Sequence, residues 1–294
     1  MQGLIIENAA NLYKVKVIDR IYNCTARGKI KQDELTPLVG DFAEITVINE
    51  VNGEAVIEKV THRKTEIKRP RLANISQLVL IVSMKDPSPD LLLLDKQLAF
   101  AEFLKINALI VLNKMDLDTR SEYKRIEEIY QKIGYKVFET DAMTGIGIST
   151  LKDALLNNRN AFSGSSGVGK SSIINQIIGK EVALPGAVSE KNGRGKNTTT
   201  ITKLYDIGPS TFIADTPGFS VFDVDDIPPL ELDKCFREFK NYRKNCKYDD
   251  CSHVNEIDCG VKAAIKKGIV DSIRYDHYVK IYNELKEKEA HQWE

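Results

Sequence analysis

Short apolar runs that alternate with polar residues fill the first 70 residues of the chain. A period of two, interrupted by Gly28, Pro37, Gly40 and Asn52-Gly53, is typical of strands joined by tight turns. The runs are Leu4–Ile6, Tyr13–Val17, Ile21–Ala26, Phe42–Val47 and Ala55–Ile57. Five short strands in this length predict an all-β barrel of the OB type, a fold that often binds oligonucleotides. A plain β-domain with a structural role is the alternative, because a fold alone does not show a function.

A different pattern begins at residue 76, where apolar strands alternate with helical segments. The strands are expected at 78–82, 108–112 and 136–138, and the helices at 91–104 and 121–133. This alternation predicts an α/β domain with a mostly parallel sheet covered on both faces. Sheets of this kind bind ligands at the carboxyl ends of their strands. Further helices, expected at 230–242 and 272–288, predict a separate α-helical part at the C-terminal end.

Basic and acidic residues balance at 42 each, so the chain has no global positive field that would attract nucleic acid. The stretch 59–71 is a local exception, with six Lys and Arg residues and one acid. A solvated linker and a phosphate-contacting segment explain it equally well. Any contact with nucleic acid is therefore expected from local patches.

We expect a cytoplasmic protein with no membrane partner, because no long apolar span and no secretory signal is found in the sequence. In a reducing cytosol, clustered thiols are candidates for metal binding rather than for disulfides. Cys246, Cys251, His253 and Cys259 form such a cluster. Three thiolates and one imidazole predict one closed, tetrahedral zinc site without an open position for catalysis. Unrelated buried cysteines are the alternative.

The stretch from Gly164 to Ser171 matches the P-loop pattern of a glycine, four residues and Gly-Lys-Ser. Glycines allow backbone N–H groups to turn inward around an anion, and the following helix directs its positive end to the same point. Lys170 is expected at the β- and γ-phosphates and Ser171 at magnesium. The predicted nucleotide contacts here are Gly164, Ser165, Ser166, Gly167, Val168, Gly169, Lys170, Ser171 and Ser172.

The segment Asn113-Lys114-Met115-Asp116 follows the second strand of the predicted sheet. It matches the Asn-Lys-x-Asp signature, in which a carboxylate accepts hydrogen bonds from the guanine edge. Ala142 is expected beside the same base, although Asp141 stands where a serine is common. Together with the P-loop, these residues predict binding of GTP and GDP.

A basic, glycine-containing stretch at 193–200 ends in three threonines and predicts a switch that orders around magnesium and the γ-phosphate. Thr199 is the expected magnesium ligand, with an uncertainty of one position. Asp215 and Gly218, in an Asp-x-x-Gly motif, are expected at the magnesium water and the γ-phosphate. The predicted catalytic set is Lys170, Thr199, Asp215 and Gly218.

The order of these motifs is unusual for a GTPase, because the guanine motifs precede the P-loop. The set is complete but circularly permuted, which nearby termini in a compact α/β domain permit. The sequence therefore predicts three domains. They are a barrel at 1–70, a permuted GTPase domain at 71–222 and a helical zinc domain at 223–294.

This combination resembles the bacterial ribosome small subunit-dependent GTPase A family of circularly permuted GTPases. The resemblance covers essentially the whole chain. It implies a late maturation factor of the small (30S) ribosomal subunit, with GTPase activity stimulated by that subunit and with rRNA contacts from the barrel and zinc domains. It implies no DNA partner, and we expect a monomer. One departure is Asn197, where many relatives carry a histidine proposed to aid hydrolysis.

Two other functions are compatible with the motifs. The protein could be an RNA-binding assembly module that uses GTP or GDP only as a structural or sensing ligand. It could also be a permuted GTPase of large-subunit assembly, although the barrel and zinc segments do not favour that function. Phe219, at the position where many GTPases have a glutamine, predicts that a partner completes the catalytic site.

Overall fold

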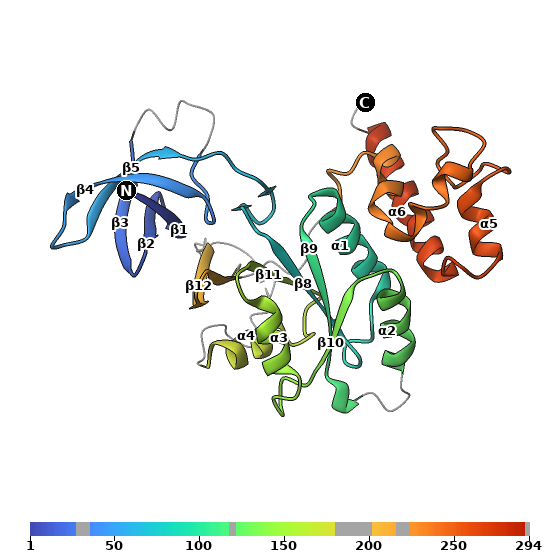
Figure 1. The fold of residues 1–294 in the computed structure, drawn as a ribbon, viewed down its shortest axis with the longest axis horizontal. Helices are drawn as coiled ribbons and strands as arrows, with labels where there is room; N and C mark the ends of the chain where they lie inside the picture. Colours follow the sequence, from blue (N-terminus) through green and yellow to red (C-terminus); the bar gives the residue numbers. More distant parts are fainter. Residues whose placement is uncertain (28–35, 118–121, 180–201, 216–223, 292–294) are drawn as a thin grey trace, which may run out of the picture. The chain divides into compact units, whose positions relative to one another are not determined.

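The computed structural model describes residues 1–27, 36–117, 122–179, 202–215 and 224–291 (Figure 1). The chain divides into two compact units. One contains residues 1–78, 148–162 and 169–220, and the other contains residues 79–147, 163–168 and 221–294. Each unit has its own set of strands and helices.

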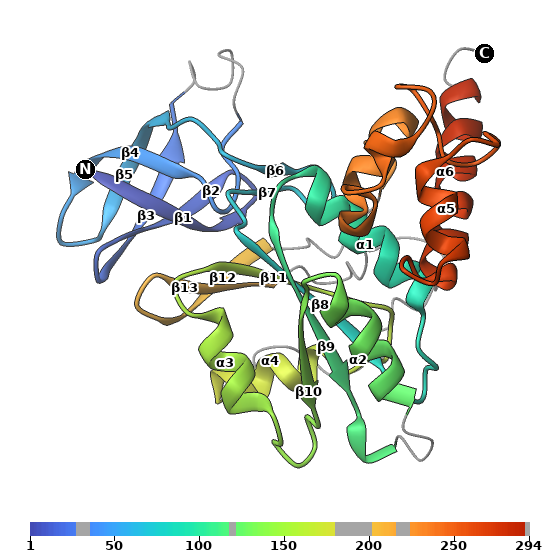
Figure 2. The ribbon, with the colours of Figure 1, turned by 45° about the vertical axis from the view of Figure 1, so that its right-hand side comes forward.

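The N-terminal strands of the first unit form a five-stranded barrel (Figure 2). Its strands are β1 (Gln2–Ala9), β2 (Leu12–Val17), β3 (Arg20–Ala26), β4 (Phe42–Asn49) and β5 (Glu54–Val60). The order β1-β2-β3-β5-β4 closes because β4 also pairs with β1. Ile5, Val15 and Ile57 are fully buried inside it. The alternating pattern thus places its apolar side chains in one core, and the predicted OB-like barrel is confirmed.

A buried ion pair holds the loop before β4 to the segment after β5. Arg63 donates from Nε and Nη2 to the two carboxylate oxygens of Asp41, both at 2.8 Å, and from Nη1 to Glu66 at 2.8 Å. Asp41 is completely buried, and its carboxylate also accepts the Leu38 N–H at 2.7 Å. Arg63 therefore has a structural role, so it does not belong to a phosphate-contacting stretch. A short hairpin of β6 (Glu66–Ile67) and β7 (Leu72–Ala73) follows.

The rest of the first unit contributes three strands and two helices. These are α3 (Ile148–Leu155), β11 (Arg159–Ser163), α4 (Lys170–Ile178), β12 (Thr202–Gly208) and β13 (Thr211–Asp215). β13 is parallel to β11 and antiparallel to β12, and β12 pairs with β1 of the barrel. The buried side chain of Asn160 donates to the Leu155 and Phe212 carbonyls, so β11 is also held by side-chain hydrogen bonds.

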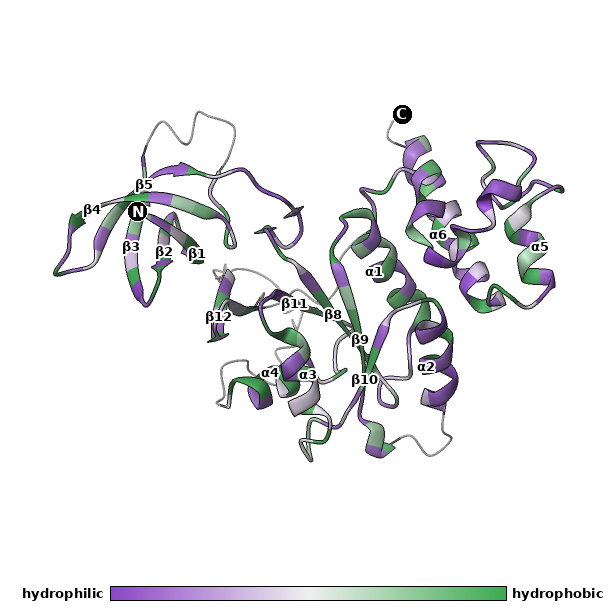
Figure 3. Cartoon of the chain, in the orientation of Figure 1, coloured by the Kyte–Doolittle hydropathy of each residue, from purple (hydrophilic) through white to green (hydrophobic). Residues whose placement is uncertain are grey.

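The second unit contains the predicted parallel strands and their helices. These are β8 (Gln77–Ser83), α1 (Leu91–Phe103), β9 (Asn107–Asn113), α2 (Glu122–Lys132) and β10 (Lys136–Thr140). β9 and β10 are parallel. α2 is hydrophilic over most of its surface (Figure 3) and buries Ile126 and Tyr130. α1 buries residues on several sides, as expected for a helix covered by other elements.

The C-terminal lobe of the second unit is built from short 3₁₀ turns and two α-helices. They are η3 (Pro229–Cys235), η4 (Arg237–Phe239), η5 (Arg243–Asn245), α5 (Gly260–Lys266) and α6 (Ser272–His291). The helix predicted at 272–288 is confirmed, whereas the continuous helix predicted at 230–242 is wrong. Phe236 is extended there and packs its ring against Phe239 and Tyr278. Every helix in the described part of the chain is too short or too polar to cross a bilayer.

Candidate functional site

The P-loop runs from the end of β11 into the start of α4. Gly164, Gly167 and Gly169 all have positive φ angles, of 150°, 81° and 98°. At Gly164 a Cβ atom would lie 2.4 Å from the Ile81 carbonyl oxygen, so only glycine fits. α4 begins at Lys170, and Gly169 at its N-cap provides no capping side chain. The first N–H groups of α4 are therefore suited to an anionic ligand.

Lys170 lies in a partly buried position at the first residue of α4. Burial lowers the pKa of its ammonium group to about 8, because removal from water disfavours the charged form. A phosphate beside the side chain would reverse this shift by favouring the charged form. Lys170 thus keeps most of its charge at neutral pH, and a bound anion would preserve that charge at a more alkaline pH.

Asn113 joins the P-loop to the loop that follows β10. Its side chain is 1% exposed, and its Nδ2 donates to the Val168 carbonyl of the P-loop at 2.8 Å. Its Oδ1 accepts the Thr140 hydroxyl at 3.0 Å and the Ala142 N–H at 3.3 Å. One amide therefore brings together the phosphate and base motifs that the sequence analysis identified separately.

The remaining residues of the Asn-Lys-x-Asp motif stand at the start of the next loop. Lys114 has a positive φ of 64°, and its Nζ donates to the Asp86 carbonyl oxygen. Met115 and Asp116 lie in the short turn η2 (Met115–Leu117), where Asp116 is exposed. The Asp116 carboxylate is therefore accessible to a ligand from solvent.

Asp141 organises the loop that carries Ala142, a role that the sequence analysis missed. Its carboxylate accepts the Thr144 hydroxyl at 2.5 Å and the Met143 N–H at 2.8 Å. The Thr144 hydrogen bond is the main reason that the pKa of Asp141 lies below its ordinary value. An aspartate followed three residues later by threonine and then by glycine is a turn signal, which could have revealed this role.

Several predicted site residues cannot be placed in the same way. Thr199, Gly218, Asn197, Phe219 and the switch at 193–200 lie outside the described residues. Asp215 is the last residue of β13, which runs parallel to β11. The backbone of Asp215 therefore lies at the sheet edge where β11 also ends, since parallel strands end at the same edge of a sheet.

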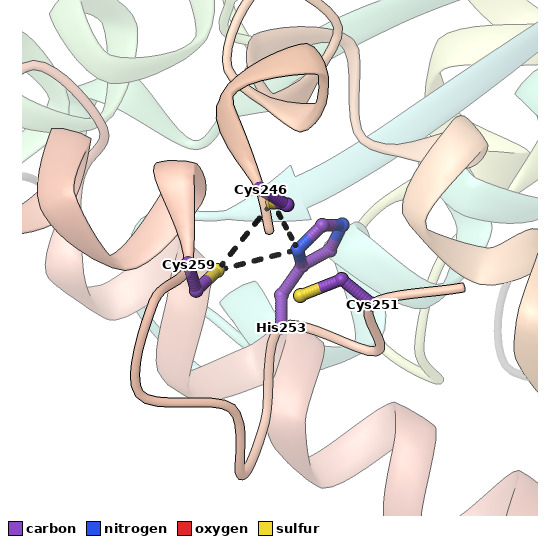
Figure 4. Close-up of side chains that lie close together, drawn as sticks. All are labelled: Cys246, Cys251, His253 and Cys259. Atoms are coloured by element: carbon purple, nitrogen blue, oxygen red, sulfur yellow. Dashed lines mark hydrogen bonds between the residues drawn. The ribbon is translucent and has the colours of Figure 1, made fainter. Parts of the chain in front are cut away.

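The four predicted zinc ligands come together in the C-terminal lobe (Figure 4). Their ligand atoms all lie within 4.8 Å of one another. His253 Nδ1 lies 3.5 Å from Cys246 Sγ and 3.4 Å from Cys259 Sγ, and the two sulfurs are 3.9 Å apart. A tetrahedral zinc ion would separate two sulfurs by about 3.8 Å and a sulfur and a nitrogen by about 3.6 Å. The spacing of Cys246, His253 and Cys259 therefore fits zinc, and Cys251 is close enough to be the fourth ligand.

The surroundings of the cluster support a cationic occupant. Burial raises the pKa of Cys251 to about 12, with a smaller contribution from neighbouring thiols, so thiolates need a metal to persist. Backbone N–H groups of Gly260 and Lys262 point at the sulfurs of Cys246 and Cys259. These N–H groups can donate to the two sulfurs, but burial favours the thiol forms until a cation binds.

Residues outside the cluster orient the His253 ring, on the side of its Nε2 atom and through its backbone carbonyl. Its buried Nε2 has no hydrogen-bond partner and lies 3.7 Å from the Asp233 carboxylate, which also accepts Arg243 at 2.9 Å. A carboxylate behind a metal-bound imidazole is a common orienting arrangement. From α6, the Tyr275 hydroxyl donates to the His253 carbonyl at 2.8 Å. The imidazole is therefore held with Nδ1 toward the thiols.

Comparisons with known proteins cover the whole chain. The model of the RsgA N-terminal domain matches residues 2–57, and that of the RsgA GTPase matches residues 60–225. The chain is 40% identical over 293 residues to the small ribosomal subunit biogenesis GTPase RsgA of Caldanaerobacter subterraneus subsp. tengcongensis. That alignment covers 100% of this chain and 98% of the relative. The relative of the same name from Clostridium acetobutylicum is 41% identical over 285 residues, which cover 97% of this chain and 98% of the relative.

Two solved structures resemble the fold over nearly its full length. YjeQ from Thermotoga maritima has a TM-score of 0.82 and 35% identity, and the match covers 97% of this chain and 98% of YjeQ. YloQ, described as a circularly permuted GTPase, has a TM-score of 0.81 and 29% identity. The match covers 98% of this chain and 95% of YloQ. The predicted fold class, a permuted GTPase domain with an OB-like barrel and a helical Cys₃His lobe, is confirmed.

Proposed function

This chain belongs to the RsgA GTPase family and is therefore a GTP hydrolase, and we propose that it acts in the late maturation of the small ribosomal subunit. The names of its relatives, which align over their full lengths, support this role. The single observation that carries the nucleotide site is the hydrogen bond between Asn113 and Val168. It joins a base-recognition motif to a phosphate loop, a combination that a mere RNA-binding module does not need.

The proposed roles follow from the positions of the motifs. Asp116 would accept the guanine N–H groups, while Asn113 and Ala142 would shape the base pocket. Lys170 would contact the β- and γ-phosphates. Ser171 and Thr199 would bind magnesium. The proposed nucleotide contacts are those of the sequence analysis, namely residues 113–116, Ala142 and 164–172.

The catalytic step would need a contribution from a partner. Asp215 and Gly218 would hold the magnesium water and sense the γ-phosphate, but Phe219 offers no hydrogen bond to an attacking water. The small ribosomal subunit, through its rRNA, would order the switch and complete the site. This cycle of GTP binding and hydrolysis would take place in the cytoplasm. It requires neither DNA nor a membrane, and one copy of the chain can carry it out.

Stimulation by the small subunit tests this proposal directly. The isolated chain should hydrolyse GTP at about 10⁻⁴ to 10⁻² s⁻¹, and purified small subunits should raise turnover by several orders of magnitude. Lys170→Ala should abolish both rates, measured as phosphate release. Large subunits serve as the control, because they should not stimulate. Fast hydrolysis by the chain alone, unchanged by small subunits, would contradict the proposal.

Base recognition predicts a change of specificity for Asp116→Asn. An amide cannot accept two hydrogen bonds from guanine, but it matches the xanthine edge, so GTP affinity should fall steeply and xanthosine triphosphate affinity should rise. Isothermal titration of the parent and the variant with each nucleotide measures both changes in affinity. The assignment is wrong if the variant binds GTP as tightly as the parent does.

Phosphate recognition by Lys170 predicts a pH dependence. The free lysine has a pKa of about 8, and bound phosphates would hold it protonated, so binding takes up a proton above that pH. The apparent Kd for GDP should therefore rise about tenfold between pH 7 and pH 9. Guanosine has the same base without phosphates and controls for ionisation of guanine. Equal pH dependence of GDP and guanosine binding would rule out this role for Lys170.

The Cys₃His cluster predicts one structural zinc ion per chain, held by Cys246, Cys251, His253 and Cys259. Structural zinc contributes about 10–16 kcal/mol of apparent binding free energy, as much as the stability of a whole domain. Cys251→Ser should therefore unfold the C-terminal lobe and abolish subunit binding. Elemental analysis and co-sedimentation measure the two effects, and Cys24→Ser, in the barrel core, is the matched cysteine control. Protein purified without chelators that contains no stoichiometric zinc would disprove the site.

A further inference from the structure

Helix α1 carries a buried charge that the nucleotide chemistry does not require. The Asp95 side chain is completely buried and has three polar partners. It accepts the Tyr130 hydroxyl at 2.7 Å and the Arg274 guanidinium, and His277 Nδ1 lies 2.6 Å from its second oxygen. Arg274 and His277 belong to α6 of the C-terminal lobe. A fully buried carboxylate thus connects α1 to the zinc-binding lobe.

Arg274 is itself held rigidly at this junction. Its side chain is 2% exposed and makes a two-point interaction with Glu238, at 2.7 Å and 3.1 Å. Its guanidinium also stacks near the rings of Tyr130 and Phe236. Because the guanidinium group is planar and preorganised, a movement of α6 would displace Asp95 by a similar amount.

The opposite side of α1 contacts the start of the P-loop. Gln97, two residues after Asp95, donates from Nε2 to the Ser163 hydroxyl at 2.6 Å, and both side chains are buried. A small cavity of about 10 Å³ is lined both by Asp90, Leu93 and Gln97 and by Gly164 and Ser165 of the P-loop. Residues two apart on a helix point in roughly opposite directions. α1 therefore lies between the lobe and the phosphate-binding loop.

Polar side chains of the lobe make two further contacts with α1 and one with the turn after α2. Arg237 donates to Glu102 at 2.7 Å and to the Gly134 carbonyl at 2.9 Å, and Lys96 pairs with Glu284. These contacts are partly exposed and contribute less than a buried pair. The buried connection is the one from Arg274 through Asp95 and Gln97 to Ser163.

We propose that α1 is a positioning element through which the C-terminal lobe sets the phosphate affinity of the P-loop, with Asp95 and Gln97 as its two contact points. The inference rests on the proposed nucleotide site and deepens it by naming its regulation. An event at the lobe, such as docking on the ribosomal particle, would shift α6, α1 and the P-loop together. By linkage, nucleotide binding would in turn tighten the lobe.

A double-mutant cycle on the full-length, zinc-loaded protein tests this connection. Asp95→Asn and Gln97→Leu should each weaken GDP binding about tenfold, within the range seen for coupled networks. The double variant should also be weakened about tenfold rather than about a hundredfold, because both changes break one connection. Lys96→Ala, which removes only the exposed pair, is the control and should leave the affinity unchanged.

Hydrogen exchange supplies a measurement that a merely structural role would not affect. GDP should slow exchange in α6 of the parent but not in Gln97→Leu. If Asp95→Asn does not fold, Arg274→Lys replaces it, since an ammonium cannot span Asp95 and Glu238 together. Additive losses, or unchanged GDP affinity in folded, zinc-loaded variants, would overturn the inference. A parent that fails to bind GDP at all would instead overturn the proposed nucleotide site.

Discussion

The nucleotide site depends on one buried amide, the side chain of Asn113. It is 1% exposed, so each of its hydrogen bonds lacks competition from water. Its donor holds the P-loop through Val168, and its acceptor holds Thr140 and the Ala142 N–H. Loss of this side chain would remove three hydrogen bonds between buried groups at once, a larger penalty than the loss of one exposed hydrogen bond. The loops for base and phosphate are therefore one structural unit.

The permuted order of the motifs makes the hydrogen bond between Asn113 and Val168 more important for joining the two loops. In this chain the base motif belongs to β9 and β10, which precede the P-loop strand β11. Asn113 and Val168 are separated by 55 residues, so no local turn could bring them together. The same order sends the chain from β13 toward the C-terminal lobe. Permutation thus makes the Asp-x-x-Gly motif and the Cys₃His lobe neighbours in sequence, while the Asn-Lys-x-Asp motif still begins at the last residue of β9.

Much of the fold could be predicted from periodicity, because the barrel strands and the α/β elements bury their residues in regular patterns. The continuous helix expected at 230–242 was wrong, since the burial of Phe236 requires an extended residue that local propensity does not reveal. The roles of Arg63 and Asp41 were also hidden. A basic run looks the same in sequence whether its arginine faces solvent or a buried carboxylate 22 residues away.

The motifs of the site could be named from the sequence, but the elements that support them could not. Asp95, Gln97 and Arg274 match no motif, and their spacing along the chain carries no signal. Their importance comes from burial, because a fully buried carboxylate is stable only where partners compensate for its lost hydration. Here the compensation comes from Tyr130 on α2 and from Arg274 and His277 on α6. The lobe that holds the Cys₃His cluster therefore completes the packing of a helix whose Gln97 donates to Ser163 at the start of the P-loop, so the packing of the lobe and that of the P-loop depend on the same helix.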